Sequence, residues 1–416
     1  MREHALIETA STFADAASTG KVRRCAVLFI EPREQLELDP AGLLAGTGAV
    51  RSRVRFVALA PHLDGEVELD EADVAALGRF GETLWIEHAT AEARVGSDAL
   101  ARLLASGLLI SDAPAHTAVR ERDEKVRDTY WKPLSALAHA FSRWSDAGVD
   151  EDVRITRHRT LTDLIREYGP PPPHMIARAT SEDRLPLPPP RRTSQDELLS
   201  RRATCRNFDA KTALDRQRFG DVLKRVVGCI AEVEILPGVN ALKKGNPSGG
   251  SLHPLEAYLV VQRVEGVTPG LYHYHVGDHA LECLATPEPA RLSELAMRCV
   301  AGQDFFAVAH ALLIIAARFR RTFWKYRNHP KAYRAIVLEA GHVSQNLYLA
   351  ATELGLGAFV TAAINEIDIE RAFGLDPLEE GPLAVCGFGL RAEQRTMLEF
   401  DPLGAVWNGT QLKADR

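Results

Sequence analysis

The chain lacks the patterns that mark several common classes of protein. Its six cysteines contain no C-x-x-C pair, so neither a zinc site nor a disulfide framework is indicated, and no metal site is expected. The absence of a Gly-Lys-Ser/Thr sequence excludes phosphoryl transfer on a P-loop. The longest apolar run, residues 305–317, is too short to span a bilayer, and no apolar signal region occurs near the N-terminus. We therefore expect a cytoplasmic protein with no membrane contact.

The chain also has no excess of positive charge. The formal net charge of −6 over 416 residues argues against a nucleic-acid partner, and none is expected. A pattern at residues 97–110 leaves a winged-helix DNA regulator as an alternative. The first 112 residues, however, lack the clustered basic recognition helix that such a protein needs.

Hydrophobic periodicity and proline content divide the chain into three regions. Residues 1–112 alternate strand-like and helical runs, which predicts a small α/β, winged-helix-like domain. Residues 113–196 combine a helical arm, with an apolar stripe that includes Trp131, and a proline-rich connector. Residues 197–416 alternate helices and strands, and we predict a central mixed sheet flanked by helices. The whole chain is therefore expected to have an α+β fold.

One predicted helix is unusually long and apolar. Pro330 suits its first turn and Gly355 its end, so the pattern predicts a helix over residues 330–354. Its apolar side chains spread around the whole circumference. We expect such a helix to be buried on all sides, at the centre of a domain or at a subunit interface.

A loop of small residues, 246–251, follows Lys243 and Lys244 and precedes a strand-like run at 255–262. Glycine tolerates positive φ and carries no Cβ, so backbone N–H groups in such a loop can approach a flat or anionic ligand closely. The same residues also suit an ordinary turn. As a cofactor cradle, the loop would use Pro247, Ser248, Gly249, Gly250 and Ser251.

Basic residues gather in two places that could bind an anion. Seven of them lie between Arg318 and Arg334, a stretch without an acidic residue, although a solvated charged face has the same composition. Within this stretch a predicted loop places Lys325 beside Tyr326. Because neighbouring cations favour the neutral form of an amine, either residue is a candidate general base. The second place is residues 201–206, where arginines flank Thr204.

Two further patterns are weaker. Residues 387–392 satisfy G-x-G-x-x-A after a strand, but the chain ends before the βαβ unit of a dinucleotide site could follow. Four histidines between His253 and His279 have no carboxylate or cysteine at ligand spacing, so turn or strand positions explain them better than a metal.

Taken in order, these segments resemble the flavin-dependent nitroreductase family, and most closely its SagB-type dehydrogenase branch, which oxidises azolines in ribosomally made peptides. The resemblance covers about residues 198–390, and residues 131–139 look similar to the helical arm of that branch. The motifs that carry it are RATCRNF at 202–208, PSGGSLHP at 247–254, KY at 325–326, YR at 333–334, LEAGHVSQN at 338–346 and LGLG at 354–357.

The resemblance implies FMN as cofactor and assigns roles to individual residues. Lys325 and Tyr326 would be the catalytic base pair, and Thr204 stands where the family usually has serine. The expected cofactor-binding residues are Arg202, Thr204, Arg206, Pro247, Ser248, Gly249, Gly250, Ser251, Gln345, Thr361, Gly387 and Arg391. The implied partners are a ribosomal precursor peptide, a YcaO-type cyclodehydratase complex and a second copy of the chain in a homodimer.

The resemblance predicts that the protein oxidises thiazoline or oxazoline rings to azoles, and two other functions remain open. The same fold could serve a NAD(P)H-dependent nitro or quinone reductase, which NADPH would bleach rapidly. Alternatively, the chain could be a non-catalytic scaffold whose first 112 residues bind a leader peptide.

Overall fold

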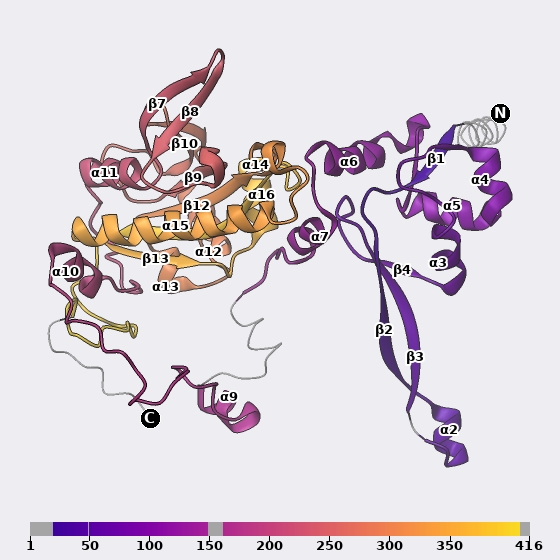
Figure 1. Cartoon of the computed structure of the whole chain (residues 1–416), viewed down its shortest axis with the longest axis horizontal. Coiled ribbons are helices and arrows are strands. Elements are labelled where there is room, and N and C mark those ends of the chain that lie inside the picture. Colours follow the sequence, from indigo (N-terminus) through magenta and orange to yellow (C-terminus); the bar gives the residue numbers. More distant parts are fainter. Residues whose placement is uncertain (1–19, 49, 149–160, 408–416) are drawn as a thin grey trace. The chain divides into compact units, whose positions relative to one another are not determined.

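The structure, a computed structural model, describes residues 20–48, 50–148 and 161–407 (Figure 1). It divides the chain into two compact units. The first comprises Met1–Arg143, Phe319–Tyr333 and Pro377–Glu379, and the second comprises Trp144–Arg318, Arg334–Asp376 and Glu380–Arg416. Both compact units are assembled from pieces distant in sequence, so they do not test a division into consecutive segments. The predicted segments 1–112, 113–196 and 197–416 therefore stay a prediction.

The first unit contains a small sheet with the strand order β5-β1-β6 and helices packed on it. Helices α4 and α5 meet at Gly96, whose φ of +84° permits the sharp turn between them. This arrangement confirms the predicted small α/β region near the N-terminus. Its elements are β1 (Lys21–Arg24), α3 (Glu71–Leu77), β5 (Ile86–Glu87), α4 (His88–Val95), α5 (Ser97–Ala105) and β6 (Leu109–Ser111).

A long hairpin belongs to the same unit. Strands β2 (Phe29–Leu38) and β3 (Val50–Leu59) pair antiparallel along their full length, helix α2 (Pro40–Ala45) lies at the tip, and β4 (Val67–Leu69) pairs with the base of β3. Residues directly opposite in an antiparallel pair share a face. Leu38 therefore lies beside Val50 on one face, while Glu37 lies beside Arg51 on the other.

Among the described residues, the predicted helical arm begins with three helices, and the last of them packs on a helix from much later in the chain. The three are η1 (Pro114–His116), α6 (Thr117–Asp128) and α7 (Pro133–Phe141), and the partner of α7 is α14 (Phe319–Tyr326). Trp131 is the centre of the contact, with ring centroids 4.6 Å from Phe319 and 4.9 Å from Phe323. Its indole N–H donates to the backbone carbonyl of Leu378 at 2.8 Å.

The second unit is built on a six-stranded sheet with the order β11-β10-β9-β12-β14-β13. These strands pair antiparallel, and a parallel bridge between Thr204 and Ala358 adds one more segment beside β13. The strands are β9 (Leu255–Val261), β10 (Gly270–His275), β11 (Ala280–Ala285), β12 (Ala311–Arg318), β13 (Gly357–Thr361) and β14 (Glu380–Gly389). A separate hairpin, β7 (Cys229–Leu236) and β8 (Val239–Lys244), projects from the unit (Figure 1).

Helices cover both faces of this sheet. On one face, Ile314 of β12 and Val385 of β14 pack in a buried cluster with residues of α12, α13 and α16. On the other, Phe388 of β14 stacks on Phe219 of α11 at 5.8 Å. The helices described in the second unit, not all of which lie on the sheet, are α9 (Leu161–Tyr168), α10 (Ser194–Arg201), α11 (Arg216–Val226), α12 (Pro289–Cys299), α13 (Asp304–Ala307), α15 (Ala332–Glu353) and α16 (Glu366–Phe373).

The long helix α15 runs lengthwise along the sheet (Figure 1). Ile336, Val343 and Leu347 are buried, as predicted. Val337 and Leu338 are 47% and 61% exposed, however, so within one chain the helix is not buried on all sides. Among the residues that the structure describes, no helix combines the length and apolarity needed to cross a bilayer.

Candidate functional site

The loop of small residues joins β8 to β9 on the surface of the second unit. Gly249, Gly250 and Ser251 form the short helix η2 and are exposed, as is Pro247. Positive φ angles occur at Gly250 (+66°), Ser251 (+55°) and His253 (+45°). Side chains other than glycine rarely adopt this conformation, and its occurrence at two neighbouring positions points to a functional constraint on the loop.

Buried polar groups hold this loop against α15. The hydroxyl of Ser248 donates to Glu339 Oε2 at 2.6 Å and accepts the backbone N–H of His253 at 2.9 Å. His253 Nδ1 lies 3.7 Å from Glu339 Oε1, and both side chains are less than 8% exposed. Asn346 of α15 donates to Asn246 Oδ1 at 2.5 Å. The conformation of the loop is therefore set by α15, and Ser248 has a structural partner in addition to its expected role.

Lys244 is buried at the end of β8, directly before the loop. Burial lowers the pKa of its ammonium group, and the nearby carboxylates of Glu256 and Glu339 oppose that shift in part. Among the described residues, no carboxylate lies within ion-pair distance of its amine. A buried lysine without such a partner is costly, which makes Lys244 a further polar group of interest at the loop.

Thr204 lies where residues 202–208 run beside β13. Its hydroxyl and the phenol of Tyr348 are 2.9 Å apart, and that phenol also accepts the backbone N–H of Val360 at 3.2 Å. The guanidinium of Arg202 lies 5.3 Å from the Tyr348 ring centroid, and that of Arg206 lies 5.9 Å from the Phe306 ring. In the part of the chain that the structure describes, neither guanidinium forms an ion pair with a carboxylate. Two half-buried arginines thus flank a hydroxyl and can receive an anion.

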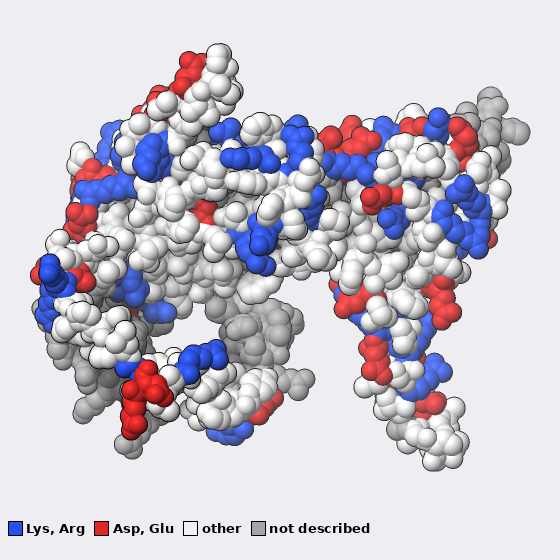
Figure 2. All heavy atoms as spheres, viewed as in Figure 1, with Lys and Arg blue, Asp and Glu red and all other residues white. Residues whose placement is uncertain are grey.

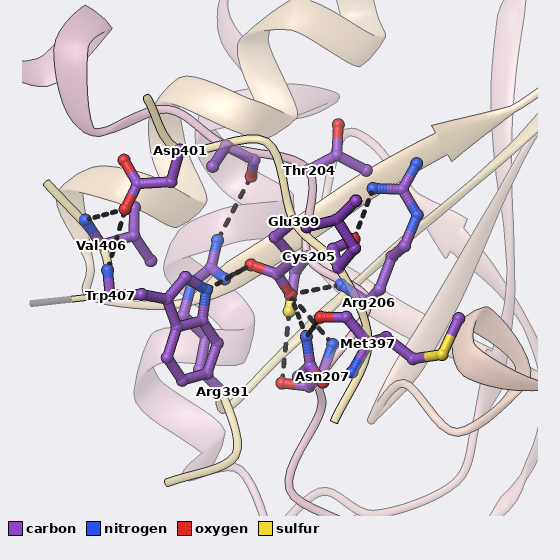
Figure 3. Close-up of polar contacts among 12 residues, drawn as sticks. Thr204, Cys205, Arg206, Asn207, Arg391, Met397, Glu399, Asp401, Val406 and Trp407 are labelled. Carbon is purple, nitrogen blue, oxygen red and sulfur yellow. Dashed lines mark hydrogen bonds and ion pairs between the residues drawn. The ribbon is translucent and has the colours of Figure 1, made fainter. Parts of the chain in front are cut away.

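Arg391 lies in the same region but already has an anionic partner. Its Nη1 is 2.7 Å from Glu399 Oε2, and its Nη2 donates to the backbone carbonyl of Ala203 at 3.2 Å (Figure 3). Glu399 is 2% exposed and also accepts N–H groups of Asn207 and Trp407. The figure shows these donors converging on the carboxylate. Arg391 therefore holds residues 203–207 in place, and its charge is neutralised.

Three other residues that were expected to bind the cofactor lie in different structural environments. Gln345 is exposed on α15, while Thr361 at the end of β13 accepts a hydrogen bond from Gln303 Nε2 at 3.1 Å. Gly387 is buried within β14, where a Cβ would stand 2.1 Å from Phe359 Cε1. Its small size is explained by packing. The dinucleotide interpretation of residues 387–392 is wrong, because both glycines lie inside the strand β14 and no helix follows among residues 390–407.

Lys325 and Tyr326 lie in the first unit, at the C-terminal end of α14. The prediction of a loop here is wrong: α14 is a two-turn helix whose Phe319, Thr322 and Phe323 are buried. Lys325 is exposed and Tyr326 is half-buried, with the amine 5.6 Å from the phenol ring centroid. A small hollow adjoins Tyr326, and its other lining residues are Tyr130, Lys132, Ser135, Phe323, His329, Pro330, Ala332 and Tyr333.

Several residues that shape these sites carry little signal in the sequence. Glu339 could have been noticed as the one acidic residue in an otherwise apolar stretch of helix. Tyr348 and Glu399 have no such signal, because their roles depend on contacts with residues more than 140 positions earlier. Asn207 likewise connects two distant segments, accepting the backbone N–H groups of Thr396 and Met397.

Part of the chain is similar to known proteins. The family model described as "Nitroreductase family" matches residues 199–390. A Methanocaldococcus jannaschii protein named as a nitroreductase is 36% identical over 147 residues, which are 35% of this chain and 70% of the relative.

Two further relatives are named for peptide processing. The trifolitoxin-processing protein TfxB of Rhizobium leguminosarum is 33% identical over 149 residues, covering 34% of this chain and 38% of the relative. The microcin B17-processing protein McbC of Escherichia coli is 30% identical over 159 residues, covering 37% and 56%. The matches span about two fifths of the length of TfxB and just over half of the length of McbC. The similarity predicted from the sequence motifs is confirmed, and the chain belongs to the nitroreductase family.

Proposed function

We propose that the protein is an FMN-dependent dehydrogenase that oxidises thiazoline or oxazoline rings in a ribosomally made peptide to azoles. One observation carries the proposal. The exposed small-residue loop and a pair of arginines without a carboxylate partner, Arg202 and Arg206, lie on one nitroreductase-family unit. The names of two relatives, both peptide-processing proteins, support a peptide as substrate.

The described residues fit FMN. Arg202, Arg206 and the hydroxyl of Thr204 would hold the phosphate, and residues 247–251 would lie against the flat ring. Arg391 would act through Glu399 and the backbone of Ala203, by keeping the phosphate-binding segment in place. Glu339 and Asn346 would do the same for the loop. Bound FMN would supply the redox chemistry, since it accepts a hydride and so carries away two electrons.

Lys325 and Tyr326 provide the acid–base chemistry in this proposal. Formation of an azole removes one hydride and one proton from adjacent ring atoms, so a base must accept the proton. Either Lys325 Nζ or Tyr326 Oη would take it. The packing of α14 on Trp131 and His139 holds the helix that carries both groups, which favours proton transfer from a defined position.

The proposed partners are a precursor peptide, a YcaO-type cyclodehydratase that installs the ring, and a second copy of this chain. The exposed apolar side chains of Val337 and Leu338 on α15 support a homodimer, because an interface would cover them.

The base assignment is tested with Lys325→Ala and Tyr326→Phe. Each purified variant is given a synthetic peptide that carries one thiazoline, and the loss of two hydrogens is followed by mass spectrometry. We expect at least one variant to slow the reaction about 100-fold or more, the contribution of a general base. Flavin content, read from visible absorbance, serves as the control. Undiminished turnover in both variants would show that the base lies elsewhere.

Reduction by NAD(P)H is a second candidate function, which the named nitroreductase from Methanocaldococcus jannaschii favours. Anaerobic mixing of the flavin-loaded protein with NADPH distinguishes the two. Bleaching of the flavin within seconds supports the reductase, and an unchanged spectrum supports the peptide dehydrogenase.

A further inference from the structure

The outer face of α14 is basic and carries a large exposed aromatic ring. Phe319, Thr322 and Phe323 are buried in the first unit. The other face of the helix is exposed and carries Arg320, Arg321, Trp324 and Lys325. Trp324 is 58% exposed. Arg327 and Lys331 extend the charge beyond the end of the helix. We call this surface, residues 320, 321, 324, 325, 327 and 331, the α14 basic face.

Several charges on this face have no carboxylate partner in the described part of the chain. Among the residues that the structure describes, Arg320, Lys325 and Lys331 form no ion pair with a carboxylate, and Arg327 lies over the Tyr130 ring at 4.6 Å. Some exposed arginines elsewhere are paired, as Arg122 is with Asp64 and Arg298 with Glu294. Figure 1 labels the position of α14. At that position the surface in Figure 2 carries Lys and Arg side chains, and no Asp or Glu side chain lies among them. In a chain of net charge −6, this concentration favours an acidic partner.

We propose that the α14 basic face binds an acidic, extended segment of a peptide, with Trp324 receiving an apolar side chain of that segment. The proposal rests on the proposed function, because it names the part of the substrate that is recognised next to Lys325 and Tyr326. A helix of this length is about 12 Å long. An extended chain covers that distance in about four residues, so carboxylates along it can meet cations along the helix, whereas a single phosphate cannot.

The exposed tryptophan supports a peptide as the occupant. Tryptophan and arginine are enriched among the residues that dominate protein interfaces, and an unpaired Trp324 between cations matches that composition. Lys325 lies on the same face and is followed by Tyr326. A segment bound here would therefore place the neighbouring residues of its peptide near the proposed base pair.

The test measures binding of a fluorescein-labelled peptide of six glutamates around one leucine to the full-length protein by fluorescence anisotropy. We expect saturable binding that weakens as sodium chloride rises, because exposed charges are screened. Arg320→Glu combined with Lys331→Glu should weaken binding about tenfold or more, since each attractive contact becomes a repulsive one. Trp324→Ala should also weaken it. Arg291→Glu, an exposed charge reversal on α12, is the matched control and should leave binding within about twofold.

Three results would overturn the proposal: equal binding of a peptide with glutamine in place of glutamate, full binding by the double variant, or tighter binding of single-stranded DNA to the same face. The assay needs neither flavin nor turnover. Loss of flavin chemistry with peptide binding intact would refute only the proposed function. Loss of peptide binding with normal azole formation would refute only the present proposal.

Discussion

Glu399 connects three segments of the second unit through one buried carboxylate. Burial disfavours its charge, but hydrogen bonds from Trp407 and from the Arg206 backbone, with the charge of Arg391, hold its pKa below the usual value. Its stabilising effect is therefore complete above the ordinary range of a glutamate and is lost as pH falls through the lowered pKa.

Replacing Glu399 by alanine should destabilise the protein strongly. The change leaves the Arg391 guanidinium and several N–H groups without their acceptor, and we expect a loss of about 3 kcal/mol in the free energy of unfolding. Urea denaturation at pH 7 measures it. Glu393→Ala, at an exposed acid, is the control and should change stability by less than about 0.5 kcal/mol. Equal midpoints for the two variants would contradict the role assigned to Glu399.

Lys244→Met should stabilise the flavin-free protein at pH 7, by about 1 kcal/mol. Methionine fills nearly the same space, and it removes a charge that burial disfavours. Because the folded-state pKa is lowered, the native protein should gain stability as pH rises toward the usual lysine value, and the variant should not. Thermal melts between pH 7 and 10 test both statements. Lys243→Met, on the exposed neighbour, is the control, and a destabilised Lys244 variant would mean that the amine has a favourable partner.

At the scale of elements, a buried histidine of α7 packs on α14, where the ring centroids of His139 and Phe319 are 4.7 Å apart. His139 Nε2 and the Pro377 carbonyl are 2.9 Å apart, and Nδ1 lies 3.3 Å from the Tyr333 hydroxyl. Burial, with a smaller effect from Arg143, lowers the pKa of His139 to about 4. The ring is therefore neutral at pH 7 in the folded protein.

Acidification should weaken the contact between α7 and α14. The unfolded chain binds a proton at His139 below about pH 6.5 and the folded chain does not until about pH 4, so stability falls across that interval. The full effect is about 3 kcal/mol. Urea midpoints at pH 7 and pH 5, which cover the larger part of this effect, are compared with those of His139→Gln, which keeps a polar contact and does not titrate. A variant with the same pH dependence as the native protein would exclude His139 as the cause.

Elements with clear periodicity and end signals were predictable from sequence. The strand-like run at 255–262 corresponds to β9 and the helix predicted over 330–354 corresponds to α15, with bounds that differ by one or two residues. The helix α14 is not apparent from sequence, because charged residues between its three buried positions hide the apolar face that contacts Trp131 and His139. The hairpin β7–β8 gives no clear signal in the sequence, because few of its side chains are buried and alternation is not visible without a covered face.

The candidate site was predictable as a set of motifs and unpredictable as a set of contacts. Thr204, the small-residue loop and the Lys325–Tyr326 pair could be named from order and spacing. The neutralisation of Arg391 could not, because it depends on Glu399, which only tertiary structure brings to Arg206 and Asn207.

For the whole molecule, the two units predict two unfolding transitions. Each has its own buried cluster, and all the expected FMN ligands lie in the second unit. Calorimetry with increasing FMN should raise the second unit's transition and leave the other unchanged, since a ligand stabilises only the part that binds it. At a concentration 100 times the dissociation constant the gain is about 2.7 kcal/mol. The variant Leu104→Ala, which opens a cavity in the first unit, assigns the transitions. A single transition that shifts as one would refute the independence of the units.

The contact between Trp131 and Leu378 joins residues 247 positions apart. During synthesis, the early aromatic residues leave the ribosome long before α14 and residues 377–379 exist to cover them. The apolar surface of the arm therefore stays partly exposed while most of the nitroreductase-like portion is translated. Contacts of such long sequence separation also form slowly. Truncated chains that stop before residue 319 should consequently be the ones that chaperones retain.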